Sequence, residues 1–146
     1  MTILSEVKAI LDSDATLLAT ATGGIWDYDE TGRMGLSRTG TESAFSSGRI
    51  KPCILLKMRS GVADGGLSDD STVSYRQVLE VWLYEDTGFA NIETMVARVW
   101  TLLHGIQVSG AFRVNWAEDI AFNVRDLDLD ASVERSDYVV QSMREK

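Results

Sequence analysis

Few side chains in this 146-residue sequence could carry out covalent or acid–base chemistry: one histidine, one cysteine and a group of closely spaced aspartates. A serine nucleophile with a histidine base could only be built on His104, and no G-x-S-x-G elbow is present. His104 directly precedes Gly105 at the end of a predicted helix. A histidine there interacts favourably with the helix C-terminal dipole whether or not it does chemistry. The sequence therefore favours a capping role for His104.

Residues 126–130 read Asp-Leu-Asp-Leu-Asp, which resembles the opening of a calcium-binding loop. Such a loop also needs glycine at its sixth position and glutamate at its twelfth. Those positions hold Ala131 and Asp137 here. The better interpretation is a solvated acidic edge of a sheet, where charges prevent unwanted strand pairing. A small metal-assisted hydrolase that combines this cluster with His104 remains open as an alternative.

Cys53 is the single cysteine, which excludes a disulfide scaffold and a cysteine-based zinc site and fits a reducing cytosol. No basic pair flanks it, so we expect a small buried residue rather than a reactive thiolate. The glycine pairs at 23–24 and 65–66 lack the spacing of phosphate-binding and dinucleotide-binding loops and are expected to form turns. These residues predict no catalytic site, no cofactor and no metal.

The overall charge argues against a nucleic-acid-binding protein. Fourteen Lys and Arg face 22 Asp and Glu, which gives a net charge of −8. Phosphate backbones are held mainly by Lys and Arg, and the acidic charge is spread along the whole chain. The sequence contains no run of 18 apolar residues, and its first ten residues lack a continuous apolar stretch. We therefore expect neither a membrane span nor a secretory signal.

Hydrophobic spacing predicts the elements that position these side chains. Apolar residues recur at helical spacing after each of three predicted N-caps: Thr2, then either Ser13 or Asp14, and then Asn91. The last of these helices ends at Gly105. Alternating or continuous apolar runs predict the following strands: 25–28, 53–59, 73–84, 112–116, 120–124 and, as an edge strand, 138–143. One α+β domain spanning residues 1–146 follows, with a mostly antiparallel sheet and helices packed on one face.

The predicted core lies between the last helix and the longest strand. Met95, Val99 and Leu102 should pack against the strand face that carries the apolar residues at 79, 81 and 83. The 53–59 and 73–84 strands should pair as a hairpin.

Two polar segments interrupt this pattern, an arm at 29–50 and an exposed loop at 61–70. The arm is longer than most structureless connections, so it is either a mobile surface loop or a segment that orders against a partner. We expect that residues 33–47 contribute nothing to the core. The candidate interaction residues of the arm, the loop and the aspartate cluster are Arg33, Arg38, Phe45, Arg49, Asp69, Asp70, Asp126, Asp128 and Asp130.

The arrangement as a whole resembles a known family. Its features are the Ala15–Leu18 helix end before Gly-Gly-Ile-Trp, the polar arm, and the Lys51–Leu56 strand opening. They continue with the Leu79–Tyr84 strand end, a helix running from Asn91 to Gly105, and a closing segment at 137–140. In this order they resemble the tail-terminator, or tail-completion, proteins of long-tailed bacteriophages and related tail-like particles.

The resemblance implies a structural virion protein and no enzyme. Such proteins form a six-membered ring on the last ring of the tail tube, stop its growth and join the tail to the head connector. The implied partners are further copies of the chain, the tail tube protein and the connector protein, and DNA passes through the ring without specific binding. The implied location is the neck of a virion assembled in the host cytoplasm. A head-completion or connector-adaptor protein of the neck is the alternative within this class.

Overall fold

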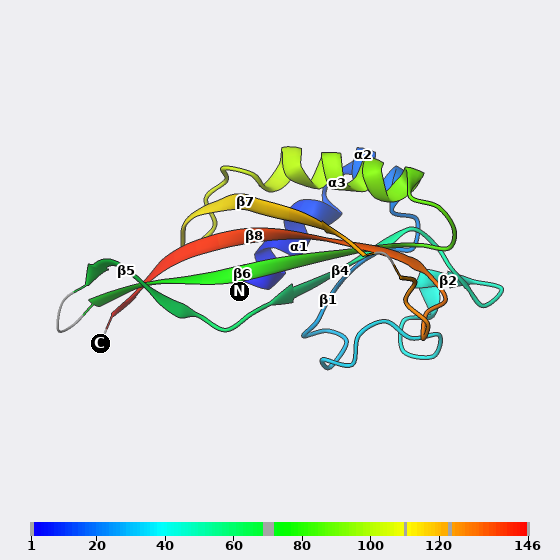
Figure 1. The fold of residues 1–146 in the computed structure, drawn as a ribbon, viewed down its shortest axis with the longest axis horizontal. Helices are drawn as coiled ribbons and strands as arrows, with labels where there is room; N and C mark the ends of the chain where they lie inside the picture. Colours follow the sequence, from blue (N-terminus) through cyan, green and yellow to red (C-terminus); the bar gives the residue numbers. More distant parts are fainter. Residues whose placement is uncertain (1, 69–71, 110, 123, 146) are drawn as a thin grey trace.

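The computed structural model describes residues 2–68, 72–109, 111–122 and 124–145. In that part of the chain, six strands form one sheet, three α-helices lie on one face of it, and two very short strands form a separate hairpin (Figure 1). The α+β class predicted from the sequence is confirmed. No helix among the described residues combines the length and the apolar character needed to cross a membrane.

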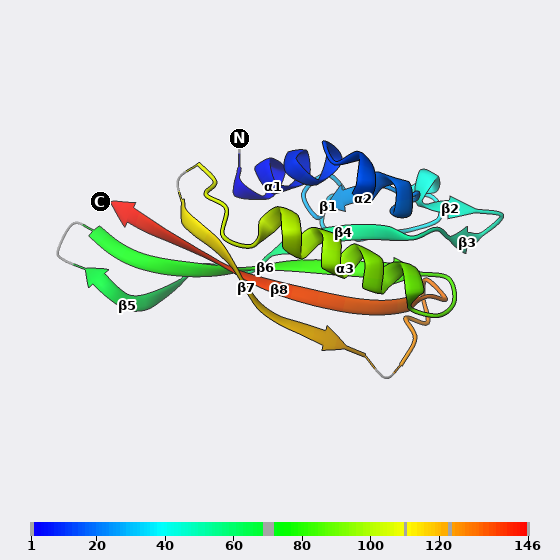
Figure 2. The ribbon, with the colours of Figure 1, turned by 90° about the horizontal axis from the view of Figure 1, so that it is seen from above.

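The main sheet has the order β1-β4-β6-β8-β7, and β5 also pairs with β6. The β1·β4 pair is parallel and all other pairs are antiparallel. The strand bounds are β1 Ile25–Asp27, β4 Cys53–Met58, β5 Val62–Ser68, β6 Thr72–Glu85, β7 Ala111–Ala121 and β8 Ser132–Glu145. Figures 1 and 2 show that β5, the adjacent part of β6 and the end of β8 extend well beyond the helices.

Local side chains fix where the helices begin. Thr2 caps α1 (Ile3–Asp12) by accepting the Ser5 N–H, and Asp14 caps α2 (Ala15–Thr20) by accepting the Leu17 N–H. The cap predicted at Asn91 is wrong, because α3 spans Ala90–Leu103 and has no side-chain cap of its own. The buried Glu85 carboxylate replaces it by accepting hydrogen bonds from the backbone N–H groups of Asn91 and Ile92.

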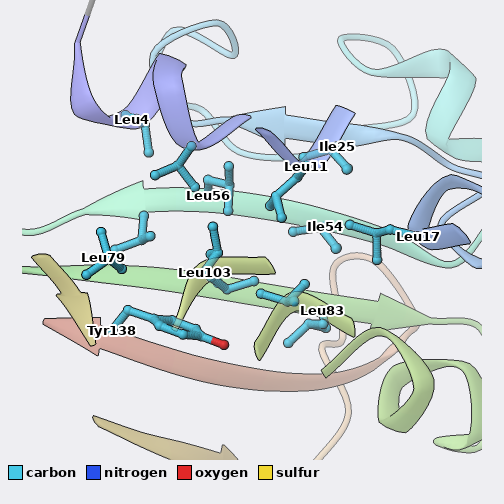
Figure 3. Packing of buried hydrophobic residues seen from close by; sticks show 14 of the residues in the cluster. Leu4, Leu11, Leu17, Ile25, Ile54, Leu56, Leu79, Leu83, Leu103 and Tyr138 are labelled. Atoms are coloured by element: carbon cyan, nitrogen blue, oxygen red, sulfur yellow. The ribbon is translucent and has the colours of Figure 1, made fainter. Parts of the chain in front are cut away.

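The main core lies between the helices and the sheet. Figure 3 shows side chains from α1, α2, β4, β6, α3 and β8 converging there, among them Leu11, Ile54, Leu79 and Tyr138. The predicted packing of α3 on the 79, 81 and 83 face is confirmed, with one change: Leu103 is fully buried, whereas Leu102 is only partly buried.

A second, smaller core lies on the helix-free face of the sheet, at the end away from the β5 extension. It joins sheet residues such as Leu55 and Val133 to residues of the polar arm. The arm forms a 3-10 turn at Glu42–Ala44 and a short hairpin of β2 (Phe45–Ser46) and β3 (Arg49–Ile50). The expectation that residues 33–47 contribute nothing to the core is wrong, since Leu36, Thr41 and Ala44 are buried.

Two further expectations are corrected by the sheet pairing. Residues 62–68 form strand β5 rather than a loop, because β6 continues past β4 and leaves its backbone groups available for pairing there. The last strand, β8, is not an edge strand: it pairs with β6 on one side and with β7 on the other. The aspartate cluster is accordingly the turn between β7 and β8, not an acidic sheet edge.

Candidate interaction surfaces

A network of paired charges occupies the helix-free face of the sheet, where β4, β6 and β8 lie side by side. The Asp137 carboxylate is almost completely buried and accepts hydrogen bonds from Arg135 Nε at 2.9 Å and Arg59 Nη2 at 3.0 Å. Arg59 Nε also lies 2.6 Å from Glu80 Oε2. Both carboxylates are thus neutralised by arginine, as buried charges must be.

Aromatic rings complete this surface. Trp82 donates its indole N–H to Glu80 Oε1 at 2.9 Å and stacks on Phe122 with centroids 5.6 Å apart. Lys57 Nζ lies 4.7 Å from the Trp82 ring centre and 4.9 Å from that of Tyr28. Partial burial lowers the pKa of Lys57, and the nearby Glu80 opposes that shift. Rings and cations therefore hold each other in fixed positions.

An open hollow of about 650 Å³ lies beside this network, at the sheet edge formed by β1 and β4. The start of α1 forms one wall, and Tyr28, Arg33, Lys57 and Arg59 line much of the rest. A smaller hollow of about 340 Å³ continues along the helix-free face, where Arg59 meets valines of β5, β6 and β8. Arg59 borders both hollows, and half of its side chain is exposed.

The Arg38 side chain ties the polar arm to the β7–β8 turn. Arg38 donates hydrogen bonds to the carbonyl oxygens of Gly48, Asp128 and Leu129, and its guanidinium lies 5.3 Å from the centre of the Phe45 ring. Two of the predicted interaction residues, Arg38 and Phe45, are therefore brought together with a third, Asp128. Within the chain, they tie the arm to the turn.

The remaining predicted interaction residues are dispersed. Arg33 is exposed and lies 3.6 Å from Asp29, and Arg49 lies 3.5 Å from Asp86. Asp126 Oδ1 accepts the Leu129 N–H within its own turn. Arg125 donates to Asp130 and to the carbonyl oxygen of Asp86. Asp69 and Asp70 lie outside the described residues.

The two candidate reactive side chains have structural roles. His104 is the C-cap of α3, stacks on Trp100, and accepts the backbone N–H of Trp116 through Nδ1 at 3.0 Å. Cys53 is completely buried, as predicted, and burial raises the pKa of its thiol to about 12. Within the described ranges, no group of three or more His, Cys, Asp or Glu side chains could hold a metal ion.

The exposed groove formed by Trp100 and Trp116 was not among the sites predicted from the sequence. Trp100 on α3 and Trp116 on β7 are 47% and 41% exposed and line a shallow groove of about 410 Å³. Trp116 donates its indole N–H to Asp119, which also accepts the Ser136 hydroxyl. The signal was present: Trp100 lies outside the apolar stripe of its helix, so the stripe itself predicts an exposed indole.

No protein-family model matches this sequence, and no curated protein matches it. Among solved structures, the fold is similar to that of a chain in the "Virion of native gene transfer agent (GTA) particle". The two chains share 17% sequence identity, each is covered over 100% of its length, and the TM-score is 0.59. At this identity the similarity establishes a common fold.

Proposed function

We propose that this chain is a structural, non-enzymatic protein of a phage-like virion. In this proposal six copies form a ring that caps the tail tube, ends its elongation and joins the tail to the head connector. The single observation that carries the proposal is the full-length fold similarity to a chain of a gene transfer agent virion. The order of sequence features that resembles tail-terminator proteins supports the finer assignment independently of that comparison.

The surfaces of the chain are suited to assembly. A closed ring requires a heterologous interface, in which one patch meets a different patch on the next copy. A specific interface buries about 800 Å² on each partner. Two such patches on one copy would cover about 1,600 Å², roughly a fifth of the 8,023 Å² of accessible surface. The charged network, the two hollows and the groove of Trp100 and Trp116 provide surface at several separate places.

The charge of the chain supports passage of DNA without binding. Six copies at −8 each carry a nominal charge of −48, which repels phosphates near a shared channel. At physiological salt this repulsion is screened beyond about 8 Å, so only residues that face the channel matter. Assembly in the host cytoplasm and incorporation into the virion neck belong to the same proposal.

Electron microscopy of tails tests this proposal. Particles produced with the chain should carry tails of one length, each closed by a ring at the end that receives the head. Without the chain, we expect overlong tail tubes to which no heads are attached. Tails of normal length that lack only their connector would contradict the terminator role and favour a connector adaptor.

A further inference from the structure

One face of α3 is exposed, and its residues follow helical spacing. They recur four, seven, eight and eleven positions after Glu93 and so share one stripe: Glu93, Ala97, Trp100, Thr101 and His104. Strand β7 adds a second exposed tryptophan, Trp116, and the two indoles line the groove of about 410 Å³. Tryptophan is enriched among the residues that contribute most to protein interfaces, so this groove has the composition of a docking surface.

The groove is rigid before any partner binds. Trp100 stacks on His104 with ring centres 5.2 Å apart and an interplanar angle of 10°. His104 in turn accepts the backbone N–H of Trp116, and the Trp116 indole donates to Asp119. Both indoles are therefore fixed by contacts within the chain. A partner would not have to order them, which lowers the entropic cost of docking.

Carboxylates gather at the groove without a cation beside them. Asp119 lines it, Glu93 lies one helical turn from the lining residue Ala97, and Glu134 lies on the neighbouring strand β8. The pKa of Glu134 is raised, first by burial and then by repulsion from Asp119 and Glu93, so the three negative charges act on one another. Among the described residues, none of the three forms an ion pair with Lys or Arg. A partner that brings positive charge would relieve this repulsion.

The shape of the groove also limits its occupant. It is concave, so a partner must project side chains into it. Its volume lies near the lower end of the range of about 300–1,000 Å³ that is typical of ligand pockets, which suits one or two side chains. An arginine or lysine side chain fits this setting. Its apolar stem packs along an indole while its charged end lies over the ring face and within reach of the carboxylates.

The cations of the chain itself are largely engaged elsewhere. Many of the described Lys and Arg side chains already pair with carboxylates of their own chain: Lys8, Arg33, Arg49, Arg59, Arg98, Arg125 and Arg135. Arg38 donates to three carbonyl groups, and Lys57 lies near the centres of two aromatic rings. A second copy would have to give up such contacts to fill the groove. The charges therefore favour a different protein as the occupant.

We propose that the groove of Trp100 and Trp116 docks an arginine- or lysine-bearing segment of a different protein. The cation of that segment lies against the exposed indoles and pairs with the carboxylates of Glu93 and Asp119. An interface of this kind is enriched in arginine and aromatic side chains. The inference does not depend on the proposed ring, because the groove is complete within one copy of the chain.

Nuclear magnetic resonance of the indole N–H groups tests this docking on the full chain. The chain has four tryptophans, and those at 26 and 82 lie outside the groove. The probe is a short peptide of alternating leucine and arginine, and its control carries glutamate in place of each arginine. The arginine peptide should shift the signals of Trp100 and Trp116 in a saturable way at about 1 mM or below, and the other two signals should stay in place. The glutamate peptide should shift none of them.

A matched pair of charge variants tests the carboxylates. Glu93→Gln combined with Glu134→Gln should weaken binding of the arginine peptide at least about tenfold. Glu42→Gln combined with Asp128→Asn removes the same charge at exposed positions of the arm and the β7–β8 turn, and it should leave binding unchanged. An equal loss in both double variants would mean that the peptide responds only to net charge, which overturns the inference.

A second matched pair tests the indoles. Trp100→Ser should weaken the response of Trp116 at least about tenfold, whereas Leu18→Ser, which alters another exposed apolar residue on α2, should not. The signals of Trp26 and Trp82 should keep their positions in both variants, which verifies that the fold is retained.

The remaining outcomes separate the possible occupants. If neither indole signal shifts with the arginine peptide, the inference is overturned. If spermidine shifts both signals as strongly as the peptide does, the groove is a site for small cations and the docking surface is wrong. If Trp100→Ser abolishes self-association of the chain in sedimentation velocity, a second copy is the occupant and the inference is equally wrong. A chain that still terminates tails after any of these results leaves the proposed function in place.

Discussion

Replacing Leu103 by alanine tests which face of α3 is buried and which face is exposed. Leu103 is 0% exposed and packs in the main core, whereas Leu102, the next residue on the helix, is only partly buried. The same substitution at both positions is therefore a matched pair. Both variants lose the same side-chain carbon atoms, and the two positions differ only in the direction in which the leucine side chain points.

The expected magnitudes follow from burial. Truncating a buried leucine removes three carbon groups at about 0.8 kcal/mol each, or about 2.4 kcal/mol of transfer free energy. The cavity that remains raises the cost, so Leu103→Ala should lower the free energy of unfolding by about 3–4 kcal/mol. Leu102→Ala loses part of the transfer term and leaves an open surface, so about 1 kcal/mol is expected.

Urea titration followed by circular dichroism measures both values. The chain should be kept dilute enough to remain monomeric, because assembly would make the apparent stability depend on concentration. In thermal melts, Leu103→Ala should lower the midpoint by about 6–16 °C. If both variants lost the same free energy of unfolding, or if Leu102→Ala lost more, the buried face assigned to α3 would be wrong. The exposed position of Trp100 would then be wrong as well.

Four further outcomes are expected. Glu85→Ala should cost about 1–2 kcal/mol in urea titrations, because it removes the carboxylate that caps α3, and Glu85→Gln should cost less. The Arg98 guanidinium lowers the pKa of Asp14 from 3.8 to about 2, so this ion pair stabilises the fold above pH 3.8 and the contribution is lost as the pH falls towards 2. Stability measured across that range should depend less on pH in Asp14→Asn, which keeps a capping side chain. Cys53 should resist a disulfide reagent at pH 8 in the native protein and react fully in urea, since burial raises its pKa to about 12. The unmodified protein should show no duplex DNA binding at physiological salt in an anisotropy assay, and tight, salt-sensitive binding would favour a nucleic-acid-binding connector instead.

Much of the fold was predictable because its signals are local. Helical spacing in α1 and α3, the continuous apolar run of β4 and the alternation in β6 each concern neighbours in the sequence. The caps at Thr2 and Asp14 belong to the same class. These features were enough to predict the α+β class and the buried face of β6.

What could not be predicted depends on distant partners. The Gly-rich residues of β5 form a strand only because β6 extends past β4. Strand β8 lies inside the sheet because β7 pairs with its outer side, and the residues of β8 do not themselves indicate this pairing. The sequence predicts Arg38 only as a candidate interaction residue of the arm, yet its hydrogen-bond acceptors include two carbonyl groups about 90 positions away in the same chain. Pairings of this kind exist only once the fold has formed.

The mass of the purified chain in solution, measured by native mass spectrometry with and without tail tubes, tests the central claim most directly. A single copy has a mass of 16.1 kDa, so a ring of six has a mass of about 97 kDa. The proposed function predicts a closed assembly of that mass, formed alone or on contact with tubes, that remains bound at one end of each tube. A chain that stays at 16.1 kDa in both conditions and leaves the tubes uncapped would contradict it.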